Sequence, residues 1–330
     1  MEEKIKIYIP NDVYQTLLKD MELFEFYKND HSLNKNEFLN KLIVNYHSSY
    51  AESNSKIYEH IKNNLKVLGM SDTIASSNAS SITEFTTKQA LDLDNKKLDV
   101  VISMKPTKFS SRTFDYVESF LLNGSSMSGW LRNLLASYVR LPQDKREKII
   151  FKENFDAINE ALEKNKMLYF VVKNKNGKKH RVSPFALSSS KEELFNYLIA
   201  QEHGKPFSFR VSRISNITVL NEQCNVSKNC STVFEKMVKY GPQFTYSLDE
   251  NEPIKIKLTE RGKLMYERIY IHRPPYSEID DNIYTFDCST NQVTQYFQRF
   301  GRNAIILSPE NIRNEMFNYY KDACNAYCEQ

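Results

Sequence analysis

The stretch that decides the fold reads NKMLYFVV over residues 165–172, KNKNGKKHR over 173–181, VSPFAL over 182–187 and FSFRVSRI over 207–214. Its short runs are rich in aromatic and β-branched residues, as strands are. The Asn-Gly pair at 176–177 supplies the positive φ that a tight hairpin turn needs. Further runs at 194–200 and 214–220 bring the strand count to five. Five strands in about 55 residues predict a small closed β-barrel.

The same stretch is strongly cationic. Residues 166–213 hold ten Lys and Arg against three acids, whereas the formal net charge of the whole chain is only +4. A local excess of this kind indicates a surface that meets an anionic partner. For any single cation in the stretch, a structural salt bridge or a solvated position is the alternative interpretation.

The order of residues along this stretch resembles the WYL domain, an Sm-like barrel of bacterial regulators, over residues 150–221. The resemblance is carried by Tyr169, Gly177, Arg181-Val-x-Pro184-Phe-x-Leu187, Asn196-Tyr-Leu198 and Phe209-Arg-Val-x-Arg-Ile214. In that family a basic, partly aromatic groove binds a nucleic acid or a nucleotide-like effector. The resemblance therefore implies a binding site made of Arg181, Tyr197, Arg210 and Arg213. Guanidinium groups grip phosphates while an aromatic ring stacks on a base, which holds a single strand with little sequence preference.

Lysines also surround the predicted hairpin turn. Lys173, Lys175 and Lys179 are included in the predicted nucleic-acid site as charges that steer an anion toward the groove. The alternative is a solvated loop with no ligand contact.

A strand, helix, helix pattern occurs twice before this stretch. The first copy contains the alternating strand IKIYI at 5–9 and the helical run FLNKLIVNY at 38–46, and the second contains VVISM at 100–104 and WLRNLLASY at 130–138. The pattern resembles the ribbon-helix-helix fold of small DNA-binding repressors. A lone strand leaves its backbone groups unpaired, so each strand is expected to pair with the other copy or with a second chain.

In the ribbon-helix-helix family, outward side chains of the paired strands enter the DNA major groove. The resemblance points to Lys4, Lys6 and Tyr8 of the first copy as possible DNA-reading residues. The equivalent positions of the second strand carry no cation or long hydrogen-bond donor. The alternative is therefore that the ribbon reads no DNA and only dimerises the chain or acts as a scaffold.

The remaining segments complete the predicted layout. The run at 71–97, rich in Ser, Thr, Asn and Asp, is expected to be a linker or partly disordered, and residues 144–164 are expected to form one connecting helix. The C-terminal stretch alternates strands and helices and looks like the ferredoxin-like extension that follows WYL domains. Its aromatic final helix, from Pro309 onward, predicts a homodimer.

The predicted fold class is therefore α+β and multidomain, with tandem ribbon-helix-helix-like units, an Sm-like (SH3-type) β-barrel WYL domain and a ferredoxin-like α/β C-terminal extension. The predicted segments are a first ribbon-helix-helix-like unit at 1–50, a helix and linker at 51–96, a second unit at 97–142, a connecting helix at 143–165, the WYL domain at 166–221 and a dimerisation extension at 232–330.

Motifs for catalysis are missing from the sequence. Five cysteines without a CxxC pair and six scattered histidines support neither a disulfide framework nor a metal site, and no P-loop, GxGxxG or nucleophile elbow is present. We predict no catalytic residue, no metal and no cofactor. A nuclease built on Arg299, Arg302 and His272 is the enzyme alternative. The charged start MEEK and the lack of a long apolar run predict a cytoplasmic protein with neither signal peptide nor membrane anchor.

The combined architecture resembles the WYL-type accessory proteins of type VI-D CRISPR systems. The resemblance implies a non-enzymatic protein that binds single-stranded RNA and raises the activity of an RNA-guided CRISPR ribonuclease. The residues by themselves indicate an anion-binding regulator. The alternative is a DNA-binding transcriptional repressor whose WYL domain senses a nucleotide-like effector.

Overall fold

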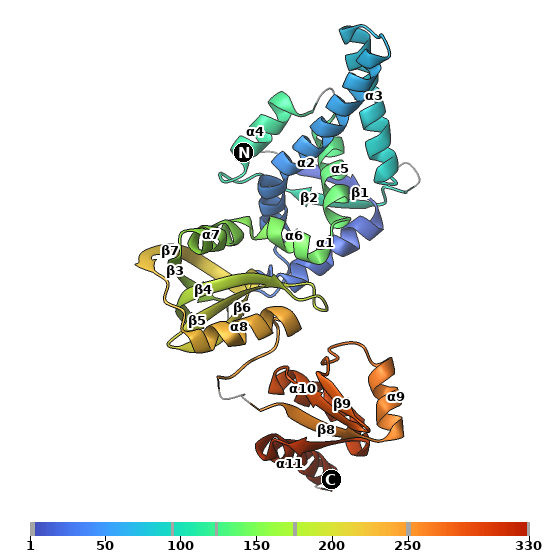
Figure 1. Ribbon diagram of the computed structural model, residues 1–330. Coiled ribbons are helices and arrows are strands. Elements are labelled where there is room, and N and C mark those ends of the chain that lie inside the picture. The colour runs from blue at the N-terminus through green and yellow to red at the C-terminus, as the bar shows by residue number, and fades with distance from the viewer. Residues whose placement is uncertain (1–3, 94–95, 123–124, 174–176, 249–251, 329–330) are drawn as a thin grey trace. The chain divides into compact units, whose positions relative to one another are not determined.

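The computed structural model describes residues 4–93, 96–122, 125–173, 177–248 and 252–328 (Figure 1). The chain forms two compact units, divided between Lys152 and Glu153. Both units combine helices with antiparallel strand pairs, so the predicted α+β class is confirmed.

A two-stranded ribbon lies at the centre of the first unit. Strand β1 (Ile5–Ile9) pairs with β2 (Val100–Met104), antiparallel, with Ile7 opposite Ile102. Both of these isoleucines are buried, whereas Lys6 and Tyr8 on the other face are exposed. The two predicted strands therefore pair within one chain, which answers the question that the sequence left open.

Three helices pack on the ribbon, namely α1 (Asn11–Leu23), α2 (Lys35–Val67) and α5 (Met127–Val139). Helices α4 (Ser111–Phe120) and α6 (Gln143–Ile150) pack against α2. Asn34 caps α2, since its side chain accepts a hydrogen bond from the Glu37 amide at 3.3 Å and donates one to the Glu37 carboxylate at 2.7 Å. Helix α1 begins directly after Pro10, which takes its N-terminal capping position.

The linker predicted at 71–97 is largely a helix. Helix α3 (Asp72–Ala90) lies against α2, which continues unbroken for 33 residues, and the two form a long hairpin in Figure 1. The residues that α3 buries are Ala75 and Ala79, four positions apart. Small side chains let two helices pack closely but produce almost no hydrophobic periodicity, which explains why the sequence pattern indicated a linker.

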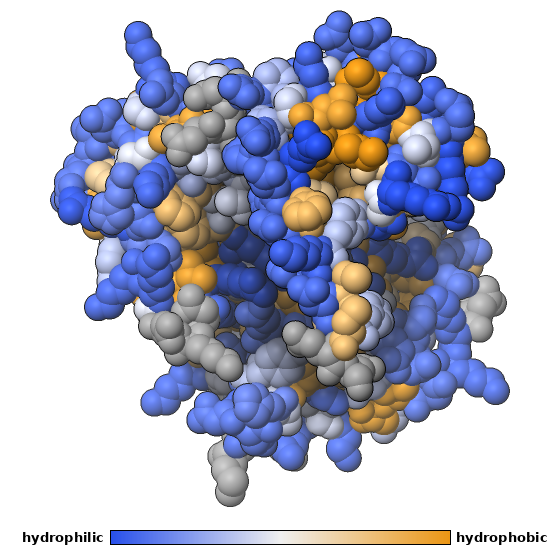
Figure 2. Space-filling model, turned by 90° about the horizontal axis from the view of Figure 1, so that it is seen from below, coloured by the Kyte–Doolittle hydropathy of each residue, from blue (hydrophilic) through white to orange (hydrophobic). Residues whose placement is uncertain are grey.

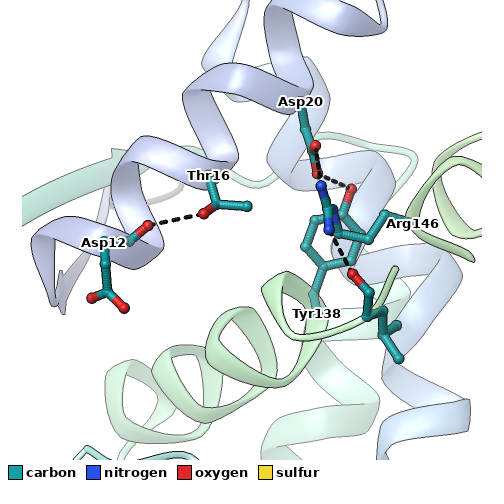
Figure 3. A network of polar contacts seen from close by, with 6 residues as sticks. Asp12, Thr16, Asp20, Tyr138 and Arg146 are labelled. Carbon is teal, nitrogen blue, oxygen red and sulfur yellow. Dashed lines mark hydrogen bonds and ion pairs between the residues drawn. The ribbon is translucent and has the colours of Figure 1, made fainter. Parts of the chain in front are cut away.

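A buried ion pair joins three helices of the first unit (Figure 3). Arg146 of α6 donates to both carboxylate oxygens of Asp20 in α1, from Nε at 2.7 Å and Nη2 at 2.8 Å, and Tyr138 of α5 donates its hydroxyl to the same carboxylate at 2.9 Å. Asp20 and Tyr138 are fully buried, and burial raises the pKa of Tyr138 well above its usual value. The hydroxyl therefore stays protonated and acts as a donor.

The single connecting helix predicted at 144–164 is divided in two. Helix α6 ends at Ile150, and α7 (Lys152–Glu163) begins after Phe151, whose backbone leaves the helical region. The ring of Phe151 is buried and packs edge-on against Phe24 at 5.7 Å between centroids. The residue at which the helix is interrupted is therefore also the one whose ring is buried.

The second unit begins with α7 and a five-stranded antiparallel sheet in the order β6-β5-β4-β3-β7. Its strands are β3 (Lys166–Val172), β4 (Lys179–Ser189), β5 (Asn196–Glu202), β6 (Lys205–Arg210) and β7 (Ile214–Gln223), with the 3₁₀ turn η1 (Val211–Arg213) between the last two. The five predicted strands are all present.

The closed barrel, however, is not found, because β6 and β7 lie at opposite edges and do not pair within the described residues. Residues 179–182 of β4 pair with β3, whereas residues 183–189 pair with β5, with an irregularity at Phe185 inside the second pairing. Strand β4 thus changes its partner between Val182 and Ser183, and the sheet consists of two ladders that do not close.

Helix α8 (Lys228–Tyr240), which the sequence did not predict, covers the ladder of β4, β5 and β6. Its Phe234 and Met237 pack with Ile199 of β5, and Phe185 joins this cluster. On α7, the Asn154 amide donates to the carbonyls of Val211 at 3.2 Å and Ile214 at 2.8 Å, which fixes η1 in place.

The C-terminal part holds a second, four-stranded sheet in the order β11-β8-β10-β9. Its elements follow one another as β8 (Ile254–Leu258), α9 (Glu260–Arg268), β9 (Glu278–Asp280), β10 (Ile283–Phe286), α10 (Thr290–Phe297), β11 (Ala304–Ser308) and α11 (Glu310–Cys328). The predicted strands and helices are present, and the short β9 is an addition. One aromatic core joins the sheet to its helices, including Phe286, Tyr296 and Phe297.

The face of the molecule in Figure 2 is mainly hydrophilic, and its hydrophobic side chains gather in separate patches. Across the described ranges, every helix lacks the combination of length and hydrophobicity that crossing a bilayer requires.

Candidate nucleic-acid interface

Tyr197 and Arg210 are direct partners across β5 and β6, so their side chains share one face of the sheet. The Arg210 guanidinium lies over the ring of Phe195 at 3.2 Å from its centroid, and its Nε donates to the Ser212 hydroxyl at 2.8 Å. The Tyr197 hydroxyl donates to Glu193 at 2.5 Å. A guanidinium held flat on an aromatic ring is a preorganised phosphate ligand.

A tight turn before β5 puts the ring of Phe195 under this arginine. The Ser190 amide donates to the Phe195 carbonyl at 2.8 Å and the Leu194 amide to the Ser190 carbonyl at 3.0 Å, which closes the turn. Asn196 follows, in the position where the WYL motif has its leading Trp. It is buried and accepts a hydrogen bond from the Ser189 hydroxyl at 2.7 Å, which ties β5 to the end of β4.

Arg213 and Lys173 come together beside this pair. The Lys173 amide donates to the Arg213 carbonyl at 2.8 Å, and both side chains are exposed. Arg213 ends η1, the turn that begins directly after Arg210. We refer to Phe195, Tyr197, Arg210, Arg213 and Lys173 as the β5–β6 cluster. It holds three cations and two aromatic rings.

Arg181 lies apart from the β5–β6 cluster. Its amide donates to Glu202 at 3.0 Å, and Glu202 is five residues along β5 from Tyr197, a distance of about 16 Å in an extended strand. The Arg181 guanidinium forms an ion pair with Glu222 of β7. Lys179 is exposed two positions earlier in β4, and Lys175 lies outside the described residues. Of the four residues predicted for the groove, the structure therefore groups Tyr197, Arg210 and Arg213.

A buried polar pair near Arg181 was missed by the sequence reasoning. His180 Nδ1 lies 2.9 Å from Glu202, and both side chains are less than a tenth exposed. The imidazole stacks on Phe170 at 5.6 Å and meets Phe209 edge-on at 4.8 Å. The alternation of β4, which turns Lys179 and Arg181 outward, would have placed His180 inward. The inward partner on β5 needs the strand register, which the sequence does not supply.

The ribbon carries the other predicted site residues. Lys4, Lys6 and Tyr8 are exposed, and Lys6 and Tyr8 lie opposite Ser103 and Val101. The Tyr8 side chain is 46% exposed, which is open enough for a base or an apolar partner. The structure thus groups these three residues on one face, within the first unit.

The remaining candidates are the side chains that could serve catalysis or metal binding. No group of three or more His, Cys, Asp or Glu that could hold a metal ion occurs among the described residues. Burial raises the pKa of the Cys224 thiol, which disfavours its nucleophilic thiolate form. The Arg299 guanidinium, part of the alternative nuclease, lies over the ring of Tyr296 at 5.2 Å.

Comparison with known proteins agrees with the sequence resemblance. Residues 153–219 match the family model of the WYL domain, so the match includes α7 as well as the strands and ends within β7. The chain is similar to a solved structure described as a CRISPR Cas-related protein, with 20% identity, a TM-score of 0.68 and coverage of 100% of this chain and 95% of that chain. This likeness shows a shared fold.

A second solved structure, the proteasome accessory factor B/C (PafBC) of Arthrobacter aurescens, matches with 16% identity over 67% of this chain and 36% of its own. Its TM-score of 0.24 is too low to support an argument. The search of curated proteins finds no match. The predicted WYL resemblance is therefore confirmed, and the chain shares its overall fold with a CRISPR-related protein.

Proposed function

We propose that the protein is a non-enzymatic accessory protein that binds single-stranded RNA and modulates an RNA-guided CRISPR ribonuclease. Two findings support this proposal: the WYL match and the full-length fold similarity to a CRISPR Cas-related protein. In the same proposal the first unit is a ribbon-helix-helix-like pair, the bent sheet is a variant of the Sm-like barrel and the C-terminal sheet is ferredoxin-like. The protein acts in the cytoplasm as a homodimer that forms through the C-terminal extension.

The observation that carries RNA binding is the β5–β6 cluster. Arg210 is held on Phe195, and Tyr197 stands opposite on the next strand, with Arg213 and Lys173 beside them. Phosphates meet the guanidinium and ammonium groups, and the buried ring of Phe195 supports Arg210 from below. Tyr197 is also buried, so base stacking on its ring is not part of the proposal. A flexible single strand can bring neighbouring phosphates to these cations more easily than a stiff duplex can.

A titration with labelled single-stranded RNA tests this assignment. We expect Arg210→Ala/Arg213→Ala to weaken binding at least tenfold. The matched control is Lys205→Ala/Lys228→Ala, which removes two exposed cations from the same unit and the same amount of charge. We expect the control to change affinity by less than threefold. Equal affinities of the wild type and the Arg210/Arg213 variant would contradict the proposal.

Modulation of the ribonuclease requires its own assay. We expect the wild-type protein to raise the cleavage rate of an RNA-guided ribonuclease of type VI-D, and the Arg210/Arg213 variant to raise it less. A protein that binds RNA and leaves the cleavage rate unchanged would support RNA binding and contradict the accessory role.

A transcriptional repressor remains the second candidate, because Lys4, Lys6 and Tyr8 are exposed on a ribbon whose strands pair as DNA-reading ribbons do. Binding of duplex DNA from the protein's own promoter separates the two functions. Tight and sequence-selective binding that Lys4→Ala/Lys6→Ala abolishes would support repression. Weak binding that is insensitive to sequence would support the RNA-binding function.

A further inference from the structure

The two strand–helix–helix copies of the first unit differ at the corner between strand and first helix. In the first copy only Pro10 separates β1 from α1. In the second copy six residues, 105–110, separate β2 from α4. The second copy therefore contains an insertion of five residues that the paired ribbon itself does not require.

The inserted corner presents cations and an aromatic ring to solvent. Lys105, Lys108 and Arg112 are exposed, and Phe109 between them is 54% exposed. Residues 105–112 contain no acid. Among the described residues none of the three cations has an acidic partner within ion-pair distance, in contrast to lysines 62, 66, 88 and 96 of the same unit. Charge at this corner is thus available to a ligand.

Buried polar side chains fix the backbone of the corner. The Lys105 amide donates to the Asn36 side chain at 2.7 Å, and the Asn40 side chain donates to the Lys105 carbonyl at 3.0 Å. Asn40 also accepts a hydrogen bond from the hydroxyl of Ser110, and that hydroxyl accepts one from the Thr107 amide at 2.9 Å. Asn40 and Ser110 are almost completely buried. Both ends of the insertion are therefore anchored.

Such anchoring has a physical consequence for binding. A loop that must order itself around a ligand loses conformational entropy in doing so, and a loop already held in one conformation avoids that loss. An exposed ring beside three cations, on a fixed backbone, suits a flexible polyanion that carries flat groups. Every nucleotide carries a flat base together with its phosphate, whereas the carboxylates of an acidic protein surface come without an aromatic ring of their own.

We infer that the 105–112 corner is a second single-stranded nucleic-acid site, in which Lys105, Lys108 and Arg112 bind phosphates and Phe109 stacks on a base. The inference deepens the proposed function, on which it rests in naming nucleic acid as the ligand. It assigns the first unit a direct part in RNA binding, separate from the β5–β6 cluster and from the outward face of the ribbon.

The salt dependence of RNA binding by the full chain tests the phosphate contacts. We expect Lys105→Gln/Lys108→Gln/Arg112→Gln to make the slope of log affinity against log salt shallower by about 2, since each phosphate contact to a single strand contributes roughly 0.7. The control is Lys19→Gln/Lys28→Gln/Lys145→Gln, three exposed cations of the same unit. Equal slopes in the two triple variants would overturn the inference.

Photocrosslinking to an oligouridine that contains 5-iodouridine tests the stacking contact. We expect a crosslinked peptide that contains Phe109, in the wild type and also in the Arg210→Ala/Arg213→Ala variant, and its loss in Phe109→Ala. A crosslink map without residues 105–112 would overturn the second site and leave the β5–β6 cluster untouched. Unchanged RNA affinity in the Arg210/Arg213 variant together with a Phe109 crosslink would instead contradict RNA binding by the β5–β6 cluster and support RNA binding by the 105–112 corner.

Discussion

The two ends of the five-stranded sheet hold their arginines in different surroundings. At one end Arg181 is paired with Glu222, and the neighbouring His180 is buried against Glu202. At the other end Arg210 lies on the ring of Phe195, with Arg213 close by on the following turn. The cationic stretch is continuous in sequence and divided in space. Charge counted along a chain therefore overstates the charge that a ligand meets, because acids from distant strands neutralise part of it.

Removing Glu202 disrupts the end of the sheet that holds Arg181 and gives the largest expected effect. In Glu202→Ala the buried His180 and the Arg181 amide both lose their partner, which we expect to destabilise the domain by about 3 kcal/mol. Hydrogen exchange of peptides from β4 and β5 measures this loss. Glu160→Ala, which removes an exposed carboxylate paired with Lys164, is the control and should cost less than about 0.5 kcal/mol. Similar exchange in the two variants would show that the buried pair is not stabilising.

Removing the aromatic support tests the other end. Phe195→Leu keeps a buried apolar side chain but takes away the ring under Arg210, and we expect RNA affinity to fall about tenfold, or about 1.4 kcal/mol. Phe185→Leu, which changes an aromatic residue packed on Phe234 beneath α8, serves as the control. Fluorescence anisotropy with labelled RNA measures both. If Phe185→Leu lowered RNA affinity equally, the effect of Phe195→Leu would come from altered packing of the domain and not from the lost ring under Arg210.

Replacing the guanidinium of Arg210 while keeping its charge tests whether the planar group itself is needed for RNA binding. A lysine at position 210 retains the positive charge but neither stacks as a plane nor grips a phosphate with two hydrogen bonds. We expect Arg210→Lys to lower RNA affinity about fivefold, or about 1 kcal/mol. The control is Arg181→Lys, where the exposed ion pair tolerates either cation. An Arg210→Lys protein with wild-type affinity would mean that charge alone matters at this end.

Removing Arg181 is expected to have the smallest effect. Because its guanidinium is paired with Glu222 and about half exposed, Arg181→Ala should change RNA affinity by less than twofold and stability by less than about 0.5 kcal/mol. Isothermal titration with RNA and thermal unfolding check the two values. A large loss of affinity would return Arg181 to the binding site and join the two ends of the sheet into one groove.

Patterns with strong local periodicity were predictable from the sequence. The alternation of β1 and β2, the stripe of α1 and the elements of the C-terminal part all follow from the spacing of apolar residues. Helix α3 was not predictable in this way, because the residues that it buries are alanines. Helix α8 begins at Lys228, between the segments predicted for the WYL domain and for the C-terminal extension. Closure of the sheet was also not predictable from the sequence, because the point between Val182 and Ser183 at which β4 changes its partner from β3 to β5 depends on strand register.

The candidate site was predictable only in part. Residue types identified Arg210, Tyr197 and Arg213 through the resemblance to the WYL motif, whereas Phe195, the ring that supports Arg210, has no place in that motif. The separation of Arg181 depends on Glu222, which lies 41 residues further along the chain. Pairing between residues so distant in sequence is set by strand register, and strand register depends on the whole sheet.

The pairing of β1 with β2 inside one chain also has a consequence for any ligand of the ribbon. In a ribbon made by two identical chains every side chain appears twice about a twofold axis, so both ends of the ribbon are equivalent and a palindromic ligand fits best. In this ribbon the six-residue corner follows Met104 at one end, and at the other end only Pro10 separates β1 from α1. The two ends are therefore chemically different. We expect a bound strand to have a fixed direction, with its 5′ and 3′ ends distinguished by which of them meets the corner.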